Sequence, residues 1–359
     1  MVLARRNLAL EFDEVRDGHL RVEAMRGELV ESVHRVSVAV VDAEGRLVAR
    51  AGDPDFVTFI RSAAKPFQAL PLVEDGAAQR FGVTDEELAL ACASHNSEPA
   101  QVDAVRRLLT RLGLAESDLA CGPHRPLSVE LALADASGVP SAIPKPQSAE
   151  ADQSGSEGRL ASNCSGKHVA MLALALHRGW STSGYHQAGH PVQRRCLQVM
   201  AHWTGLPDSD IGEAVDGCGV VTFAIPMRSL ALAYARLAAS DQAAPRRVVQ
   251  AMMSHPHLVA GRWRPCTALM RAYPGRLLAK VGAEGVYGAA LPERRLGIGV
   301  KVEDGHTWAS VVALWAVLEQ LGLDPPPRVT EPGFAEVPIR NTRGEVVGSL
   351  RASGKLTFV

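Results

Sequence analysis

The sequence predicts a mixed α/β fold in which a mainly antiparallel sheet, built from the two ends of the chain, holds an inserted helical part. Apolar and polar residues alternate near the N-terminus, at 22–51, and strand patterns return at 277–302. Most of the chain between these stretches has helical periodicity, and no internal repeat is present. One sheet assembled from both ends explains this order.

Size and charge restrict the class of protein further. The chain has 359 residues, of which 47% are hydrophobic and 21% charged, with a net charge of −1. This balance argues against nucleic acid or an anionic membrane as the main partner, because both need a basic surface. No run of 18 apolar residues appears, and the first 20 residues turn acidic early. We therefore expect no transmembrane helix and no secretory signal, and a cytoplasmic protein.

The N-terminal part is predicted to be β-rich. Residues 1–20 resemble a loosely ordered extension, and 21–359 are expected to form a single catalytic domain. Two β-rich runs within 22–51 flank a polar, glycine-containing loop at 42–46, which is typical of a hairpin. A further strand is expected at 57–61.

The middle of the chain, about 66–275, is predicted to be the helical part. The first helix opens at Ser62-Ala63-Ala64-Lys65-Pro66 and runs to about Val73. Residues 138–161 carry Gly, Pro, Ser and Gln without periodicity, so a mobile loop is expected there. The other helices are predicted at 84–93, 99–113, 166–178, 190–204 and 224–239.

The final third completes the sheet, whose parts are expected at about 22–61 and 276–359. An apolar helix is expected from Thr307 to Leu321, ended by Pro325-Pro326-Pro327, with a hairpin or edge segment at 335–350. The remaining strands are predicted at 277–281, 285–290 and 295–302.

Cysteine and lysine are the informative residue types. Six cysteines are too few for a disulfide scaffold, so they fit core positions, metal ligands or nucleophiles. Only six of the 38 basic residues are lysine. A buried lysine can become a neutral base or a ligand, whereas arginine keeps its proton. The lysines are Lys65, Lys145, Lys167, Lys280, Lys301 and Lys355.

Two lysine motifs indicate nucleophilic chemistry. In Ser62-x-x-Lys65 a neutral lysine, three residues along a helix, would take the serine proton; alternatively Ser62 caps the helix and Lys65 is solvated. Lys280-Val281-Gly282 is the Lys-x-Gly strand that accompanies Ser-x-x-Lys in penicillin-binding enzymes, or else a simple β-turn. Gly282 would let a substrate backbone lie against the strand.

Three further motifs combine small and polar residues. Ala91 to Glu98 reads ACASHNSE, in which Asn96 or Ser97 would serve as a helix cap, while Ser94 and His95 need another explanation. Asn163 to His168 reads NCSGKH, and Asp216 to Gly219 reads DGCG. Two cysteines and one more donor would make an open zinc site, with His168 the conventional third ligand and Lys167 a rarer one. Two unrelated buried cysteines explain the same pattern.

Taken in the order in which they occur along the chain, these five motifs resemble those of the rhizobial-type L-asparaginases, also called class 3 or asparaginase II-like. The resemblance spans about residues 22–350. It implies a serine β-lactamase-like and glutaminase-like fold, which agrees with the sheet and helical insert expected above. Members of this family are dimers, so a homodimer is expected.

The resemblance also implies roles for individual residues. Ser62 would be the nucleophile with Lys65 as its base, and Ser94 and Lys280 would form a second Ser–Lys pair. Zinc in this family lies near the reaction centre and aids substrate binding. Here its ligands would be Cys164, Lys167 and Cys218, with a water close to Asp216. The substrate-binding residues would be Arg61, His95 and Asp216.

The expected reaction is the hydrolysis of L-asparagine to L-aspartate and ammonia through a serine acyl-enzyme, faster at alkaline than at neutral pH because the lysines must be neutral. The same residues would serve a glutaminase, a peptidase or a β-lactam hydrolase, and a non-catalytic amide- or zinc-binding protein is a further alternative. The sequence departs from the family in the long polar segment at 145–160 and in residues 1–20.

Overall fold

The centre of the molecule is one antiparallel sheet. The computed structural model describes residues 19–123, 158–262, 264–323 and 334–359, within which this sheet has nine strands. Its main order is β10-β11-β1-β2-β9-β8-β7. The strands are β1 (Leu20–Arg26), β2 (Leu29–Asp42), β3 (Leu47–Ala51), β7 (Leu278–Gly282), β8 (Val286–Leu291), β9 (Leu296–Val302), β10 (Glu336–Arg340), β11 (Val346–Ser353) and β12 (Thr357–Phe358).

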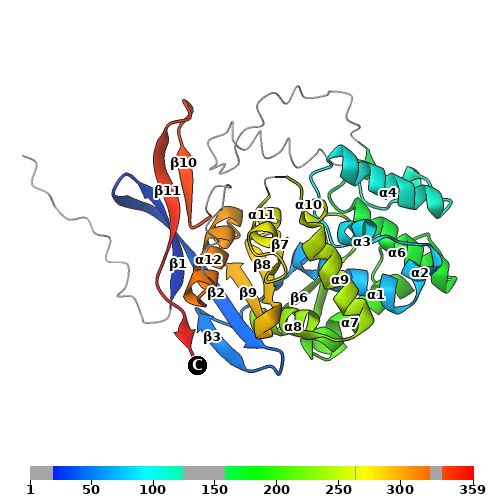
Figure 1. The fold of residues 1–359 in the computed structure, drawn as a ribbon, viewed down its shortest axis with the longest axis horizontal. Helices are drawn as coiled ribbons and strands as arrows, with labels where there is room; N and C mark the ends of the chain where they lie inside the picture. Colours follow the sequence, from blue (N-terminus) through cyan, green and yellow to red (C-terminus); the bar gives the residue numbers. More distant parts are fainter. Residues whose placement is uncertain (1–18, 124–157, 263, 324–333) are drawn as a thin grey trace, which may run out of the picture.

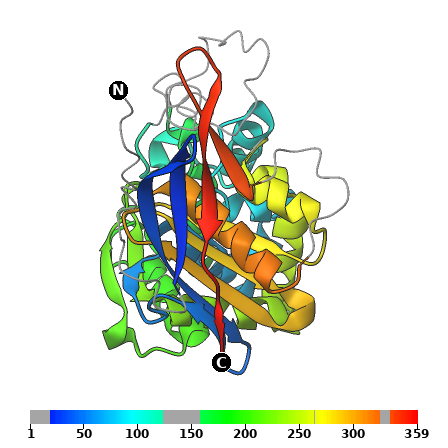
Figure 2. The same ribbon diagram turned by 90° about the vertical axis from the view of Figure 1, so that its left-hand side faces the viewer.

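The N-terminal strands β1 and β2 lie between C-terminal strands in this sheet. β1 pairs with β11, and β2 pairs with β9. The long strand β2 is paired along one edge with β1 and then with β3, and along the other edge with β9. Figure 2 shows the N-terminal strands (blue) beside the C-terminal ones (red). The predicted sheet from both ends of the chain is therefore confirmed.

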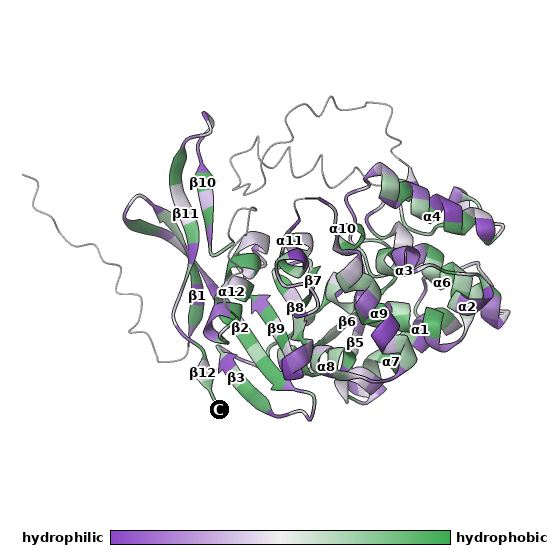
Figure 3. Ribbon diagram, in the orientation of Figure 1, coloured by the Kyte–Doolittle hydropathy of each residue, from purple (hydrophilic) through white to green (hydrophobic). Residues whose placement is uncertain are grey.

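Helices cover both faces of the sheet, so the covered parts of its central strands are mostly apolar. α8 packs against β2, β8 and β9, while α12 packs against β1, β9 and β11. Residues 36–41 of β2 are all buried, which explains why their sequence is an almost unbroken apolar run. Figure 3 shows this concentration of apolar residues in β2 and β9.

Most helices lie between β4 and β7 in the chain and gather on one side of the sheet (Figure 1). The α-helices are α1 (Lys65–Glu74), α2 (Ala77–Arg80), α3 (Asp85–Ala91), α4 (Pro99–Arg111), α6 (Ser165–Arg178), α7 (Pro191–Thr204), α8 (Met227–Ala239), α9 (Ala243–Ser254), α10 (Pro256–Val259), α11 (Pro265–Ala272) and α12 (Thr307–Gln320). Short 3₁₀ turns are η1 (Arg61–Ala64), η2 (Glu116–Asp118), η3 (Arg159–Ala161), η4 (Asp208–Asp210) and η5 (Pro292–Arg294).

A second sheet of three strands, which the sequence analysis does not predict, lies among these helices. Its order is β4 (Val57–Phe59), β6 (Val221–Pro226) and β5 (Gly212–Val215), all antiparallel. The prediction of a helix from 224 is wrong at its start, because β6 continues to Pro226 and α8 begins at Met227. This small sheet places Ser62 just beyond the end of β4 and Asp216 directly after β5.

The other predicted elements agree with the structure to within a few residues, with some omissions. The loop at 42–46 joins β2 to β3 as expected, but a second tight turn at Gly27 divides the N-terminal run into three strands. α9 and α11 were not predicted. Most of 1–20, 145–160 and the predicted loop at 138–161 lie outside the described residues.

In the described part of the chain, no helix has both the length and the apolar character needed to span a membrane.

Candidate active site

Ser62 lies in a strained turn between the small sheet and α1. Ile60 N–H donates to Phe223 O at 2.9 Å, which ties the start of the turn to β6. Arg61 then has φ of +49°, a left-handed conformation that costs a non-glycine residue about 1 kcal/mol or more. The N-cap of α1 is Ala64, without a side-chain cap, so the alternative that Ser62 caps this helix is wrong.

Lys65 is completely buried, which excludes the solvated lysine of the alternative interpretation. Its ammonium nitrogen donates to the carbonyl of Ala93, to Ser94 Oγ at 3.0 Å and to the carbonyl of Asn163 at 3.5 Å. These acceptors belong to two different motifs, so Lys65 joins α1 to both. Among the described residues, the Ser62 hydroxyl has no hydrogen bond to another side chain.

Lys280 reaches the same serine from the main sheet. Its Nζ lies 2.9 Å from Ser94 Oγ and 2.8 Å from the carbonyl of Val281. Burial, together with the charge of Lys65, lowers the pKa of Lys280 to about 7. A lysine with this pKa is substantially neutral at physiological pH. Ser94 is thus shared by two buried lysines.

The strand of Lys280 lies directly against the turn of Ser62. A Cβ atom on Gly282 would lie 2.6 Å from the carbonyl oxygen of Ile60, so only glycine permits this approach. From the sequence, Gly282 is expected to let a substrate backbone lie against the strand. In the structure the glycine makes room for the chain's own carbonyl, immediately before Arg61.

The predicted zinc ligands lie together at the start of α6. Lys167 Nζ is 3.1 Å from Cys218 Sγ. A hydrogen bond from the Cys164 thiol lowers the pKa of Cys218 to about 5, and the same contact, with burial, raises that of Cys164 to about 12. Burial opposes the charge of Lys167, but the charges of Cys218 and its neighbours raise its pKa. A thiolate and an ammonium therefore face each other.

The described residues contain no group of three or more His, Cys, Asp or Glu side chains suited to a metal ion. A zinc ion held by Cys164 and Cys218 would therefore need the Lys167 amine as third donor. His168 does not offer its Nδ1 for this purpose, because that atom lies 2.6 Å from the Tyr185 hydroxyl. Burial and the charge of Lys167 lower the pKa of His168 to about 3.

Arg61 and Asp216, both predicted to bind substrate, are paired with each other. Arg61 Nε donates to Asp216 Oδ1 at 2.6 Å, and the backbone N–H of Gly217 donates to the same oxygen at 2.9 Å. Although burial acts in the opposite direction, the charges of Lys167 and Arg61 lower the pKa of Asp216. The pair joins the Ser62 turn to the Cys218 loop.

His95 is fully buried, and its ring is held by the fold. Its Nδ1 accepts from the backbone N–H of Ser97 at 3.1 Å, so Nε2 carries the proton and donates to Ser165 Oγ at 2.9 Å. This arrangement fixes the Ser94 loop against α6, and a direct role in substrate binding stays a prediction. The N-cap of α4 is Glu98, so the expectation that Asn96 or Ser97 caps this helix is wrong.

A search with family models gives a match over almost the whole chain. The model described as L-asparaginase II matches residues 22–352, a range that contains every site residue discussed above. The chain belongs to the L-asparaginase II family. The resemblance inferred from the five motifs is therefore confirmed. A search of curated proteins gives no significant match.

Solved structures similar to this L-asparaginase II family chain are distant. Mglu in its native form is 18% identical, with 80% of this chain and 64% of Mglu covered and a TM-score of 0.43. A β-lactamase from Mycobacterium bovis is 15% identical, covering 79% of this chain and 94% of that one, with a TM-score of 0.32. A penicillin-binding protein homologue from Pyrococcus abyssi is 14% identical, with coverage of 83% and 75% and a TM-score of 0.32. The chain spans about 64% of the length of Mglu.

The sequence analysis did not single out two residues that support Lys280. Cys266 Sγ accepts from the backbone N–H of Val281 at 3.2 Å and lies 3.0 Å from the Tyr287 hydroxyl. Both side chains are buried. Cys266 was visible only as one of six cysteines, and nothing in the sequence around Tyr287 indicates that it lies beside the site.

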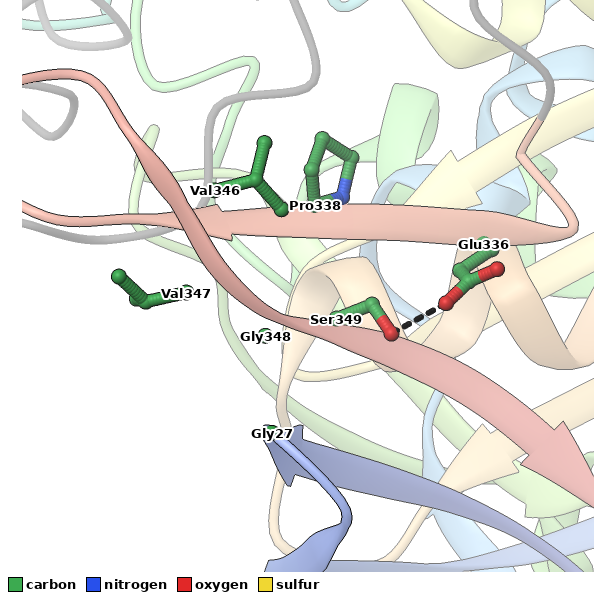
Figure 4. Close-up of a pocket in the computed structure, with 7 residues that line it drawn as sticks. All are labelled: Gly27, Glu336, Pro338, Val346, Val347, Gly348 and Ser349. Atoms are coloured by element: carbon green, nitrogen blue, oxygen red, sulfur yellow. Dashed lines mark hydrogen bonds between the residues drawn. The ribbon is translucent and has the colours of Figure 1, made fainter.

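A cavity of about 580 Å³ lies elsewhere, on the hairpins β1–β2 and β10–β11 (Figure 4). It contains no predicted site residue, and its one ionisable side chain, Glu336, accepts a hydrogen bond from Ser349. The cavity is lined by Gly27, Glu336, Pro338, Val346, Val347, Gly348 and Ser349.

Proposed function

We propose that this chain hydrolyses the side-chain amide of L-asparagine to give L-aspartate and ammonia, with Ser62 as the nucleophile. The observation that supports this best is the position of Ser94, whose hydroxyl lies within hydrogen-bonding distance of both Lys65 and Lys280. Lys65 follows Ser62 by one helical turn. These contacts form a relay of exchangeable protons from Lys65 through Ser94 to Lys280, and we propose that the Ser62 hydroxyl joins it at Lys65.

The partners of the two lysines suggest their protonation states. Lys65 has three acceptors, which match the three N–H groups of an ammonium ion. Lys280 has one backbone acceptor besides Ser94, and its pKa is lowered to about 7. In its neutral form the Lys280 amine accepts the O–H of Ser94. Lys280 is then the final base, and Lys65 is the link to Ser62.

The first step follows from this arrangement. The neutral Lys280 amine takes the Ser94 proton, Ser94 takes one from the Lys65 ammonium, and the Lys65 amine so formed takes the Ser62 proton as Ser62 Oγ bonds to the amide carbon. The net transfer is one proton from Ser62 to Lys280. The proton returns along the same path to the departing nitrogen, which leaves as ammonia, and water then cleaves the ester of Ser62. The backbone N–H of Ser62 is our candidate donor to the oxyanion.

Zinc fits the donors at the start of α6. Cys164 and Cys218 supply sulfur ligands, one of which is already favoured as a thiolate, and Lys167 supplies nitrogen once it has lost its proton. A zinc ion held there would place a positive charge beside the Arg61–Asp216 pair, where it would aid the binding of an amino acid. We propose that Arg61, His95 and Asp216 orient the substrate, with no chemical step assigned to the metal.

Ammonia release from L-asparagine, compared between wild type and Ser62→Ala at mildly alkaline pH, tests this proposal. We expect the substitution to reduce activity by at least about 1000-fold with the fold intact. L-Glutamine, a β-lactam and a dipeptide, assayed in parallel, test the alternative amide substrates. An active Ser62→Ala variant would overturn the nucleophile assignment, and a wild type active only on another amide would overturn the substrate.

We further infer that the protein is a cytoplasmic homodimer. Six free cysteines in the structure suit a reducing compartment. Val57 and Phe59, on the same face of β4, are 61% and 40% exposed, an apolar surface that a second copy would cover. Light scattering should give the dimer mass for wild type and the monomer mass for Val57→Glu. If the Val57→Glu variant were still a dimer, the interface would not include this surface of β4.

A further inference from the structure

Tyr234 touches the Ser62 turn from a helix that carries none of the predicted site residues. It lies in α8 and is completely buried. Its hydroxyl donates to the carbonyl oxygen of Ala63 at 2.8 Å. Ala63 follows Ser62 directly, so this bond fixes the peptide unit next to the proposed nucleophile.

The turn needs such a donor because of its own sequence. In a 3₁₀ turn the carbonyl of residue 63 would accept from residue 66, but that residue is Pro66, which has no N–H. The left-handed conformation of Arg61 adds strain immediately before Ser62. The Tyr234 hydroxyl provides the hydrogen bond that proline cannot.

The tyrosine ring also contacts the strand beside Lys280. A Cβ on Gly288 would lie 2.3 Å from Tyr234 Cε2, so the ring rests directly on the backbone of β8. Gly288 is the register partner of Lys280 in the β7–β8 pair. The ring also meets Phe67 of α1 edge to face, with centroids 5.4 Å apart. The ring is thus fixed between α1 and the main sheet.

We propose that Tyr234 is a positioning residue that sets the distance between the Ser62 turn and the Lys280 strand. Its hydroxyl holds the turn, and its ring rests on the residue paired with Lys280. This inference rests on the proposed function, because it assigns Tyr234 to the nucleophile and base named there. Tyr234 touches neither substrate nor a reacting atom in this role.

Tyr234→Phe is the decisive variant, since it removes one oxygen and keeps the ring. We expect kcat for asparagine to fall about tenfold, with KM within about twofold and the pH midpoint of the rate unchanged, because the base itself is intact. Tyr273→Phe is the matched control, a buried tyrosine whose ring meets Trp315 instead. It should keep the wild-type kcat.

A second measurement follows the nucleophile without the substrate. Phenylmethanesulfonyl fluoride reacts with an activated serine, and mass spectrometry of the Ser62 peptide gives its rate. Labelling of Tyr234→Phe should be slowed to the same extent as kcat. If wild type labels at Ser62 but releases no ammonia from asparagine, the proposed function fails, while the labelling rates still test Tyr234.

Unchanged kcat and labelling in Tyr234→Phe would overturn the inference. A Tyr234→Phe chain that does not fold, or one that melts earlier but reacts at the wild-type rate, would also overturn it. Either result would make the hydroxyl a structural contact alone.

Discussion

The Ser94 hydroxyl lies within hydrogen-bonding distance of two lysines, Lys65 and Lys280, whose motifs lie far apart in the sequence. Composition alone marks the lysines as candidate functional residues, since only six occur beside 32 arginines. Burial of Lys65 and Lys280 then confirms that neither is a surface charge. That both reach one hydroxyl could not be predicted, because it depends on β7 lying against the carbonyl of Ile60.

The rate should depend on pH through Lys280. Because the pKa of Lys280 in the folded protein is about 7, the fraction of Lys280 in the neutral form increases as pH rises through this value. The value of kcat/KM should therefore rise from pH 6 to a plateau above about pH 8. Lys280→Met should lose this activity by about 100-fold or more. A rate profile with its maximum below pH 6 would contradict the assignment of Lys280 as a neutral base.

The same lysine should reduce stability at neutral pH. In the unfolded chain a lysine holds its proton up to about pH 10.4, so between about pH 7 and 10 the unfolded state binds more protons than the folded one. Stability should therefore rise with pH across this window in wild type, and this rise should be smaller in Lys280→Met. Urea titrations at pH 7 and pH 9 give the change in unfolding free energy with pH for wild type and for Lys280→Met. Lys355→Met, which alters an exposed lysine, is the control.

At the scale of elements, long periodic segments were predictable and short ones were not. The pattern of α12 and the apolar runs of β2 and β9 extend over many residues, so their period is readable. β5 has four residues, three of them exposed, and its partner β6 ends at a proline. Only tertiary contact makes these two a sheet, and this sheet carries the site loops.

Helix packing explains why position 166 of the NCSGKH motif is a glycine. A Cβ there would lie 2.2 Å from the carbonyl of Leu90, where α6 crosses the end of α3. Gly166→Ala should lower the unfolding free energy by about 2–4 kcal/mol, since backbone must move to admit the methyl group. Gly189→Ala, with open space around its Cβ position, is the control. Equal stabilities in urea would contradict this packing.

At the scale of the whole molecule, a bound metal should raise stability by binding the folded chain alone. Zinc at a hundredfold excess over its Kd would add about 2.7 kcal/mol. Purified wild type should hold one zinc per chain, and chelation should lower its melting temperature. Cys218→Ser should hold no zinc and melt at the same temperature with or without a chelator, while Cys196→Ser, a buried cysteine of α7 outside the proposed ligand set, should bind zinc as wild type does. Zinc retained by Cys218→Ser would overturn the ligand assignment.

The interleaving of the main sheet has a consequence for synthesis on the ribosome. β1 and β2 emerge long before β9 and β11, which cover their outer edges. Until then the first hairpin offers two open edges to other strands, including those of neighbouring nascent chains. The Ser62 turn can pack against the strand of Lys280 only after β7 has been translated. The chain should therefore acquire its catalytic arrangement late, after the whole helical part has been translated, and β1 and β2 are the segment most in need of a chaperone.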